Sequence, residues 1–400
     1  MRYQKLGEHV FQVRGISFKP DNIITTEKDG YVPVIRSNNI TEEGFKETDL
    51  IYIKKEFIRQ EQLIKGGDLV LTASSGSKKT IGKNIQFDCD FNGSFGAFCK
   101  LVRPKKSINS KYLYHFFKTR FFRNSIERIV QGANIANLKN EYIDDLQILL
   151  PPFDDQIRIA TLLSKVENLI TRRREQLKQL DELLKSVFLE MFGSIIKSGL
   201  FYAFGNYIDT LTDYHANGSY EILRNNVELQ ATSNYALMVR TTDLEHNNFA
   251  DGCNYITREA YEFLCKSKVY GGEIIINKIG SAGKVYLMPD LKRPVSLGMN
   301  AFLIRTNGDM NNIYLYYLLT SDFGINAIQK RIKGAVTKTI TKDAIRNIPI
   351  PVPNIDLQKQ FVDIAEKVDN IKSRYQQSLT ELENLYGVLS QKAFKGELDL

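Results

Sequence analysis

Two loops rich in glycine, serine and lysine contain the residue types best suited to holding an anion. Gly76-Ser-Lys-Lys-Thr-Ile-Gly82-Lys83 and Gly280-Ser-Ala-Gly283-Lys284 each follow a predicted strand. Small residues let backbone N–H groups approach a phosphate, and lysine adds a positive charge. The first loop is similar to a nucleotide-binding P-loop only superficially, because Asn84 replaces the Ser/Thr that binds magnesium. We expect both loops to contact nucleic-acid phosphates; the alternative is a pair of solvated polar loops.

Two further pairs of segments contain side chains that suit base reading. Arg36-Ser-Asn-Asn39 and Arg240-Thr-Thr-Asp243 place an arginine beside amide or hydroxyl groups, and Gln131-Gly-Ala-Asn134 pairs with Lys333-Gly-Ala-Val-Thr-Lys338. Arginine can bind guanine and asparagine can bind adenine through two hydrogen bonds each. The predicted DNA-binding residues are therefore Arg36, Asn38, Asn39, Ser74, Ser75, Ser77, Lys78, Lys79, Lys83, Asn134, Arg240, Thr241, Thr242, Lys278, Ser281, Lys284, Lys333 and Lys338.

Patterns for catalysis or metal binding are missing from the sequence. The four histidines stand singly and the four cysteines form no C-x-x-C pair, so we predict reduced structural thiols and no metal site. Leu150-Pro-Pro-Phe153 resembles the catalytic loop of amino-group DNA methyltransferases, but Leu150 cannot hydrogen-bond a target amino group. No glycine loop that would hold S-adenosylmethionine and no acidic nuclease cluster stands out. We predict a chain without catalytic residues.

Composition and charge favour a globular protein with a polyanionic partner. The 400 residues are 43% hydrophobic and 25% charged, and no apolar run is long enough to span a bilayer. The N-terminus lacks the apolar core of a signal peptide, so we expect a cytoplasmic protein. Residues 1–200 carry 32 Lys+Arg and 24 Asp+Glu, a balance of +8, whereas residues 201–400 carry 22 of each. This excess is weak evidence for nucleic-acid binding by itself.

The chain is a tandem repeat of one unit of about 200 residues. Lys65-Gly-Gly-Asp-Leu-Val-Leu71 recurs as Tyr270-Gly-Gly-Glu-Ile-Ile-Ile276, an offset of 205. Leu150-Pro-Pro-Phe-Asp-Asp-Gln156 recurs as Val352-Pro-Asn-Ile-Asp-Leu-Gln358, an offset of 202. Each copy opens with short β-type runs and helices, which predicts a compact α+β domain, and the prolines mark its end. We predict domains at 1–150 and 193–348, with long helices at 151–192 and 349–400.

The two helical stretches share a heptad pattern. Apolar residues are spaced alternately by three and four, which is typical of a coiled-coil seam, and Leu163, Ile170, Leu177 and Leu184 add a second apolar line. A helix from about 154 to 191 must bury such a seam, and its repeat copy is the simplest partner. We expect antiparallel pairing; the alternative is that each helix packs only on its own domain. The predicted seam comprises Leu162, Val166, Leu169, Leu180, Leu183 and Val187 with Ile364, Val368, Ile371, Leu382, Leu385 and Leu389.

This duplicated order resembles the specificity subunit of Type I restriction-modification systems over essentially the whole chain. The opening Lys5-Leu6-Gly7-Glu8-His9-Val10 is echoed by Ala203-Phe204-Gly205-Asn206-Tyr207-Ile208. The Gly-Gly-Asp/Glu strand with its Gly-Ser loop occurs twice, as does the proline and Asp-Gln stretch before a heptad helix. The second copy departs from the pattern by having Asn354 where the first has Pro152, and its domain is less basic.

The resemblance implies two target recognition domains that each read one half of a bipartite, asymmetric site in double-stranded DNA. It implies that the helices set the gap and dock two modification (methyltransferase) subunits, and through them two restriction subunits with translocase and nuclease activity. S-adenosylmethionine, ATP and Mg²⁺ would then bind in those partners, and this chain would hold no cofactor. An alternative function of another class is a coiled-coil scaffold whose repeated domains bind proteins. This alternative does not account for the paired Gly-Ser-Lys loops.

Overall fold

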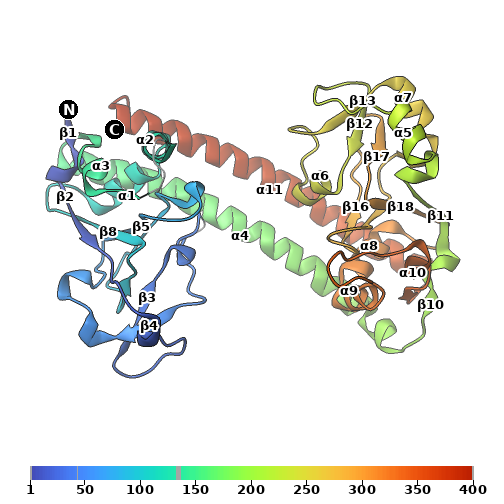
Figure 1. Ribbon diagram of the computed structural model, residues 1–400, viewed down its shortest axis with the longest axis horizontal. Coiled ribbons are helices and arrows are strands. Elements are labelled where there is room, and N and C mark those ends of the chain that lie inside the picture. Colours follow the sequence, from blue (N-terminus) through green and yellow to red (C-terminus); the bar gives the residue numbers. More distant parts are fainter. Residues whose placement is uncertain (1, 43, 132–136, 399–400) are drawn as a thin grey trace. The chain divides into compact units, whose positions relative to one another are not determined.

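The computed structural model describes residues 2–42, 44–131 and 137–398 (Figure 1). It divides into two compact units: unit 1 comprises Met1–Glu175 with Gln376–Leu400, and unit 2 comprises Gln176–Tyr375. Each unit contains one globular domain and part of each of the two long helices, α4 (Phe153–Lys197) and α11 (Ile355–Lys395). None of the described helices is both long and apolar enough to cross a membrane.

The domain of unit 1 is built around an antiparallel sheet in the order β2-β8-β5-β6. The inner strand β5 pairs with both β6 and β8, and all four of its residues are buried. Its strands are β2 (Val10–Arg14), β8 (Cys99–Pro104), β5 (Leu69–Thr72) and β6 (Asn84–Gln86); a smaller sheet has β4 (Ile51–Lys54), β3 (Tyr31–Ile35) and β7 (Ser94–Phe95), and a ribbon pairs β1 (Arg2–Lys5) with β9 (Gln147–Leu150). The helices are α1 (Ser110–Phe117), α2 (Arg120–Gln131) and α3 (Asn140–Asp144).

The domain of unit 2 repeats this plan, which confirms the tandem α+β repeat. Its main sheet has the order β11-β18-β15-β16, with β11 (Ile208–Asp213), β18 (Ala301–Thr306), β15 (Ile274–Asn277) and β16 (Val285–Leu287). The second sheet has β13 (Asn254–Ile256), β12 (Ala236–Val239), β17 (Val295–Leu297) and β14 (Lys268–Val269), and the ribbon pairs β10 (Tyr202–Ala203) with β19 (Pro349–Ile350). The helices are α5 (Tyr220–Asn226), α6 (Thr241–His246), α7 (Arg258–Phe263), α8 (Asn312–Thr320), α9 (Asp322–Gln329) and α10 (Lys342–Arg346).

A buried glutamine explains why the proline and Asp-Gln stretch precedes both long helices. The Gln156 side chain accepts a hydrogen bond from the Asn109 N–H (2.8 Å) and donates one to the Pro151 carbonyl (3.0 Å). Gln358 makes the same contacts with the Asn311 N–H (2.8 Å) and the Pro353 carbonyl (3.0 Å). Because a buried amide must have its hydrogen bonds satisfied, each glutamine ties the start of its long helix to its domain.

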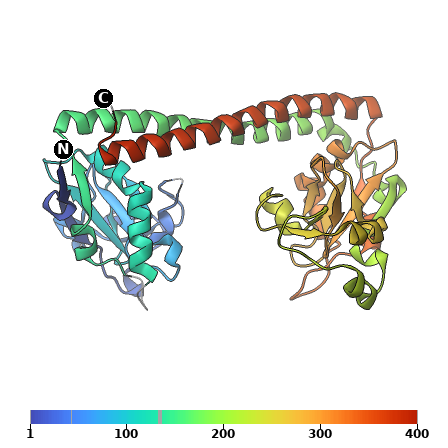
Figure 2. The same ribbon diagram turned by 90° about the horizontal axis from the view of Figure 1, so that it is seen from above.

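Within each unit, α4 and α11 lie side by side and antiparallel (Figure 2). In unit 1, Arg174 forms an ion pair with Glu383 (2.6 Å), while Ile159 and Ala160 share a core with Phe394. In unit 2, Asp181 pairs with Lys372 (2.6 Å), and the Phe361 ring packs on Phe188 with 5.4 Å between centroids. Residue numbers rise along α4 as they fall along α11 in both units. Antiparallel pairing is therefore confirmed.

The buried line of the helices includes more than the predicted seam. Val166 and Val368 are buried, and Leu162, Leu180, Val187, Ile364, Leu382 and Leu389 are half-buried. In contrast, 40% to 50% of Leu169, Leu183, Ile371 and Leu385 is exposed. Leu163, Ile170 and Leu184 of the second apolar line are buried instead. Since each helix packs on its own domain as well as on the other helix, its buried stripe is rotated toward the domain.

Helix α4 continues past the end expected near residue 191. Gly193 lies inside the helix, which ends at Lys197. Gly199 follows with a φ of +75°, a left-handed conformation that glycine adopts readily where a helix stops. The two units divide at residues 175 and 375, inside the long helices, rather than at the ends of the predicted globular domains.

Candidate nucleic-acid interface

In both units the loop after the inner strand of the main sheet is hydrogen-bonded to the segment before a short helix. In unit 1, the loop after β5 contacts the segment before α3, since the Leu138 N–H donates to the Ala73 carbonyl (2.8 Å). In unit 2, the Ile340 N–H donates to the Lys278 carbonyl (3.1 Å), and the Gly280 N–H donates to the Lys338 carbonyl (3.2 Å). In unit 2 the Gly-Ser-Lys loop and the second glycine loop thus meet at one end of the main sheet. Residues 132–134 of the equivalent second loop in unit 1 lie outside the described residues.

In both units an ion pair connects the Gly-Ser-Lys loop to the segment that begins at Arg36 or Arg240. Lys83 pairs with Glu42 at 3.3 Å in unit 1, and Lys284 pairs with Glu245 in unit 2. Glu42 follows the segment that begins at Arg36, and Glu245 lies in α6. The hydrogen bond and charge of Lys284 hold the pKa of Glu245 below its usual range. A DNA phosphate that contacts either lysine would compete with its glutamate.

The asparagine and arginine that suit base reading are partly used inside the protein. Asn39 is fully buried; its side chain accepts from the Arg36 N–H (2.9 Å) and donates to the Lys46 and Thr48 carbonyls (3.0 Å each). In unit 2, the Arg240 guanidinium donates to the carboxylate of Asp243 at 2.6 Å, and this hydrogen bond raises the pKa of Arg240. These contacts hold the two segments in shape.

The remaining predicted contacts differ in exposure. Exposed residues are Asn38, Ser77, Lys78, Lys79, Thr242, Ser281, Lys284, Lys333 and Lys338, and half-buried residues are Arg36, Ser74, Ser75, Lys83, Arg240, Thr241 and Lys278. The Lys78–Lys79 stretch is supported from α2, where Arg123 donates to the carbonyls of Lys79 (2.7 Å) and Ile81 (2.9 Å). Asn134 lies outside the described residues.

Two lysines near these loops were not singled out from the sequence. Lys100 is 5% exposed, and its amino group donates to Gln12 (3.0 Å), the Leu138 carbonyl (2.9 Å) and Asn140 (2.7 Å). Burial lowers the pKa of Lys100 to about 8. Lys342 in unit 2 pairs with Asp213 at 3.3 Å. The sequence feature that could have identified Lys100 is a lysine among apolar residues of a strand, as in Cys99-Lys-Leu-Val102.

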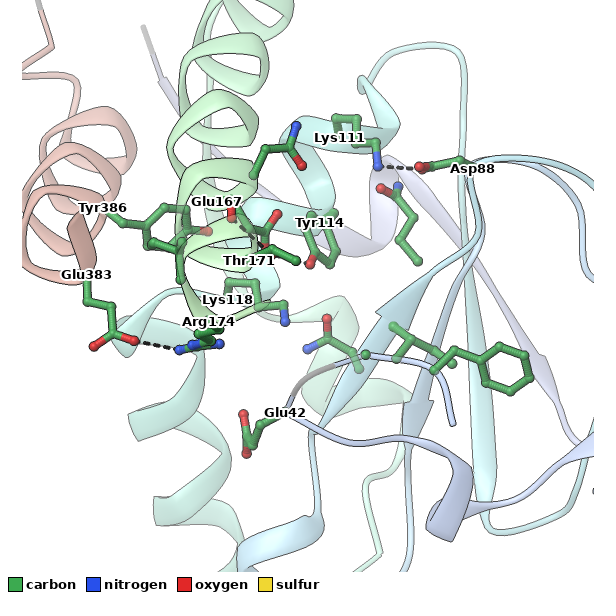
Figure 3. A pocket seen from close by; sticks show the side chains of 17 residues that line it. Glu42, Asp88, Lys111, Tyr114, Lys118, Glu167, Thr171, Arg174, Glu383 and Tyr386 are labelled. Atoms are coloured by element: carbon green, nitrogen blue, oxygen red, sulfur yellow. Dashed lines mark hydrogen bonds and ion pairs between the residues drawn. The ribbon is translucent and has the colours of Figure 1, made fainter. Parts of the chain in front are cut away.

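Unit 1 also contains a cavity of about 440 Å³ between β6, α1 and the two long helices (Figure 3). Tyr114 donates to Glu167 (2.7 Å), and the ion pair between Arg174 and Glu383 spans its edge. Opposite charges are interspersed around it: Lys111, Lys118 and Arg174 against Glu42, Asp88, Glu167 and Glu383. Over the described residues, no three His, Cys, Asp or Glu side chains are grouped to hold a metal ion.

A buried histidine joins three helices beside this cavity. His115 on α1 is fully buried, with Nδ1 2.9 Å from the Tyr386 hydroxyl and Nε2 2.8 Å from the Ser164 hydroxyl. Burial, with the charges of Lys111 and Lys118, lowers the pKa of His115 to about 3. The imidazole is therefore neutral and structural. The thiol of buried Cys99 has its pKa raised to about 12 by burial, which makes it unreactive.

Comparison with known proteins finds relatives over the full length of the chain. Residues 5–180 and 200–384 match the family described as the Type I restriction modification DNA specificity domain. The chain is 27% identical to the StySPI specificity subunit of a Type I restriction enzyme from Salmonella potsdam and 26% identical to the EcoKI specificity subunit from Escherichia coli strain K12. Each alignment covers 96% of this chain and 86% of the relative.

Two solved structures have a similar fold. The S subunit of a Type I restriction-modification system from M. genitalium superimposes with a TM-score of 0.55 at 15% identity, covering 100% of this chain and 96% of that chain. A chain from a structure concerned with complex assembly and conformational transition of the type I R-M system gives a TM-score of 0.53 at 16% identity, covering 99% and 98%.

Proposed function

This chain belongs to the family of Type I restriction modification DNA specificity domains, and from that premise we propose that its two domains read the two halves of a bipartite site in double-stranded DNA. The observation that carries this proposal is the duplicated pair of polar loops. In both units the loop after the inner strand is hydrogen-bonded to the loop before a short helix, at the same end of the main sheet. Two similar readers on one chain fit a site of two parts.

The proposed site is asymmetric, because the two loop sets differ in sequence. Between its two glycines the first loop has Ser77-Lys-Lys-Thr-Ile81, whereas the second has only Ser281-Ala282. Phosphate contacts position a protein on DNA, whereas base contacts specify the sequence. Loops with different side chains at equivalent places would read different bases, so the two half-sites should not be copies of each other.

We assign the long helices the task of setting the gap between the half-sites. Helix α4 is continuous over 45 residues and crosses the boundary between the units, as does α11 over 41 residues. A continuous helix has a fixed rise per residue, so its length can set a constant spacing. The same helices would dock two modification subunits, and these would bring two restriction subunits.

The chemistry would belong to those partners. S-adenosylmethionine, ATP and Mg²⁺ would bind in the modification and restriction subunits, with adenine methylation and DNA cleavage performed there. This chain would contribute recognition and assembly without a catalytic residue of its own. The mixed charges around the unit 1 cavity pair with one another, as Arg174 does with Glu383, and serve as structural contacts in this proposal.

A binding selection from random duplexes tests the proposal, with this chain combined with its cognate modification subunit. Enrichment of a two-part asymmetric motif with a constant gap is the expected result. Enrichment of one half alone would restrict base reading to one domain. If an active, bound complex enriches no motif, a protein-binding scaffold replaces the DNA reader. The purified chain alone should neither consume S-adenosylmethionine nor cut DNA.

A further inference from the structure

Three strands and two loops meet at one corner of the main sheet in unit 2. Asp213 ends β11 and is paired in register with Phe302, which lies near the start of β18. Lys278 directly follows β15, and Lys342 begins α10. The backbone contact between Lys278 and Ile340 closes the corner (3.1 Å). Two lysines from separate loops are therefore brought to one place.

Asp213 holds both of these lysines. Its Oδ2 lies 2.9 Å from the Lys278 ammonium, and its Oδ1 lies 3.3 Å from the Lys342 ammonium. The Asp213 side chain is only 9% exposed, whereas 30% of Lys278 and 35% of Lys342 is exposed. Desolvation opposes ionisation, but the two lysines outweigh it and lower the pKa of Asp213. The cluster carries a net charge of +1 at neutral pH.

The two ammonium groups border a hollow of about 390 Å³. The Lys278 and Lys342 ammonium groups lie 5.3 Å and 5.9 Å from the centroid of the Phe302 ring and form cation–π contacts with it. An ammonium group has three N–H donors. Among the described residues, the Lys278 ammonium group donates a hydrogen bond only to Asp213. Its remaining N–H donors can therefore bind a ligand in the hollow.

The corresponding corner of unit 1 has a different set of side chains. There the cross-strand pair is Arg14 with Lys100, in place of Asp213 with Phe302. The three hydrogen bonds of Lys100 all end on protein oxygens, and the position equivalent to Lys342 is Asn140, one of those partners. Lys100 of unit 1 is used to hold its own loop, whereas Lys278 and Lys342 of unit 2 border a hollow.

We propose that Lys278 and Lys342 together bind one phosphate of the DNA backbone at the half-site read by the second domain, with Asp213 as the positioning residue. The inference rests on the proposed function. A phosphodiester suits this site because lysine binds phosphate as a point charge and the cluster keeps a positive charge after pairing with Asp213. Since Asp213 fixes both side chains in advance, little side-chain entropy is lost on binding.

This site offsets the weaker charge of the second half of the chain, whose Lys+Arg and Asp+Glu residues are equal in number. Net charge describes long-range attraction, but a phosphate contact depends on where two ammonium groups are held. The second domain would thus bind its half-site with few, positioned cations. The first domain would use exposed lysines such as Lys78 and Lys79.

The salt dependence of DNA binding tests the clamp in the complex with the modification subunit. For the double variant K278A/K342A, the slope of log affinity against log salt should fall by about one unit, since the slope counts neutralised phosphates. Between 50 and 200 mM salt, the variant should then lose about threefold less affinity than the wild type. K292A is the matched control, because Lys292 pairs with Asp290 beyond β16, at the other end of the sheet.

Neutral phosphates locate the contact. Methylphosphonate placed singly along the selected site should weaken the wild type at one position of the second half-site and leave K278A/K342A unaffected there. If no methylphosphonate position distinguishes the wild type from K278A/K342A, and the double variant instead loses discrimination between bases at one position, the clamp is overturned in favour of base reading. K278Q/K342Q, which keeps the side-chain length, repeats the test if the alanine variant loses thermal stability.

Asp213 has its own test. D213N removes a negative charge and so raises the net charge by one, but it should weaken binding several-fold without lowering the salt slope, because the two lysines lose their position. Tighter binding by D213N would overturn its positioning role. A wild-type complex that selects no two-part motif overturns the proposed function and the clamp together. A wild-type complex that selects the motif, with an unchanged slope in K278A/K342A, overturns the clamp alone.

Discussion

The corner of the sheet at Lys100 in the first domain and the corner at Phe302 in the second occupy equivalent positions in the repeat. Both are closed by the same backbone hydrogen bond, from Leu138 to Ala73 and from Ile340 to Lys278. The side chains differ completely: one corner buries a cation with three protein acceptors, and the other holds two cations on a carboxylate. A shared frame can therefore hold its loops alike while the chemistry at their meeting point changes.

The helices show the same contrast between frame and detail. Asp181 and Glu383 are repeat equivalents, and each pairs with the opposite long helix. Their partners, Lys372 and Arg174, are not equivalents of each other. Below the ion pair, unit 2 packs an aromatic cluster around Phe361, whereas unit 1 joins its helices through His115. Four experiments use these differences, in order of expected effect.

Lengthening one helix should break the relation between the two domains while leaving each reader intact. Inserting one heptad after Leu180 is expected to change the gap of the recognised site, or to abolish specific binding. Loss of specificity corresponds to about 4–10 kcal/mol, the usual difference between specific and non-specific DNA binding. The random-duplex selection measures it. Changed half-site sequences at an unchanged gap would contradict the assignment of spacing to the helices.

Removing the centre of the aromatic cluster should destabilise unit 2 selectively. Phe361 is fully buried against Phe188, Phe192 and Tyr317. F361A should cost about 3–5 kcal/mol of unfolding free energy, as is typical of a large aromatic side chain removed from a core. Denaturant unfolding measures the loss, and limited proteolysis shows which unit opens. F153A, at a 45% exposed position of α4, is the control. Equal loss in both variants would contradict the packing described.

Acid should distinguish the two units through His115, whose equivalent in unit 2 is Tyr317. The folded-state pKa of His115 is about 3, below the usual 6.5 of a histidine, so below pH 6.5 the unfolded chain binds a proton that the folded chain does not. Stability should fall by about 1.4 kcal/mol per pH unit from pH 6.5 down toward pH 3.

Thermal unfolding of the wild type and of H115F between pH 7 and 4.5 measures this contribution. The wild type should lose about 2 kcal/mol more than H115F by pH 5. H215Q, at an exposed histidine of unit 2, should behave as the wild type. Parallel pH profiles for the wild type and H115F would mean that the imidazole takes up a proton without cost.

The smallest expected effect concerns three lysines of the loop after β5 in the first domain. Replacing Lys78, Lys79 and Lys83 by alanine should reduce the salt slope of DNA binding by up to about one unit per lost phosphate contact. K284A in the second domain is the paired comparison, since Lys284 and Lys83 occupy equivalent ion pairs. An unchanged slope in the triple variant would remove the loop after β5 from the interface.

Much of the fold was accessible from the sequence because it depends on patterns that recur along the chain. The heptads predicted two long helices, and the offset copies of Lys65–Leu71 predicted two similar domains. The antiparallel pairing also followed. The exposure of Leu169 and the burial of Leu163 could not be predicted from the heptad pattern. A helix that packs on a domain as well as on another helix buries residues beyond its coiled-coil seam.

The candidate site was accessible only in part. Residue types identified the Gly-Ser-Lys loops, and in unit 2 the structure places this loop next to the second glycine loop. The sequence pattern did not show that Asn39 is buried and makes three hydrogen bonds within the protein. Asparagine can either cap a helical turn or read a base, so the residue type alone does not distinguish the two roles. Lys342 was missed because its partner Asp213 is more than a hundred residues away.

The sequence by itself determined the repeat, the class of fold, the long helices and the resemblance to one family, since these follow from composition and spacing along the chain. Only the tertiary structure decided which charged groups meet. Asp213, Lys278 and Lys342 come together because three strands end at one corner, and Lys100 is buried because its strand lies inside the sheet. Charges interact through space, so their partners depend on the fold rather than on their order in the chain.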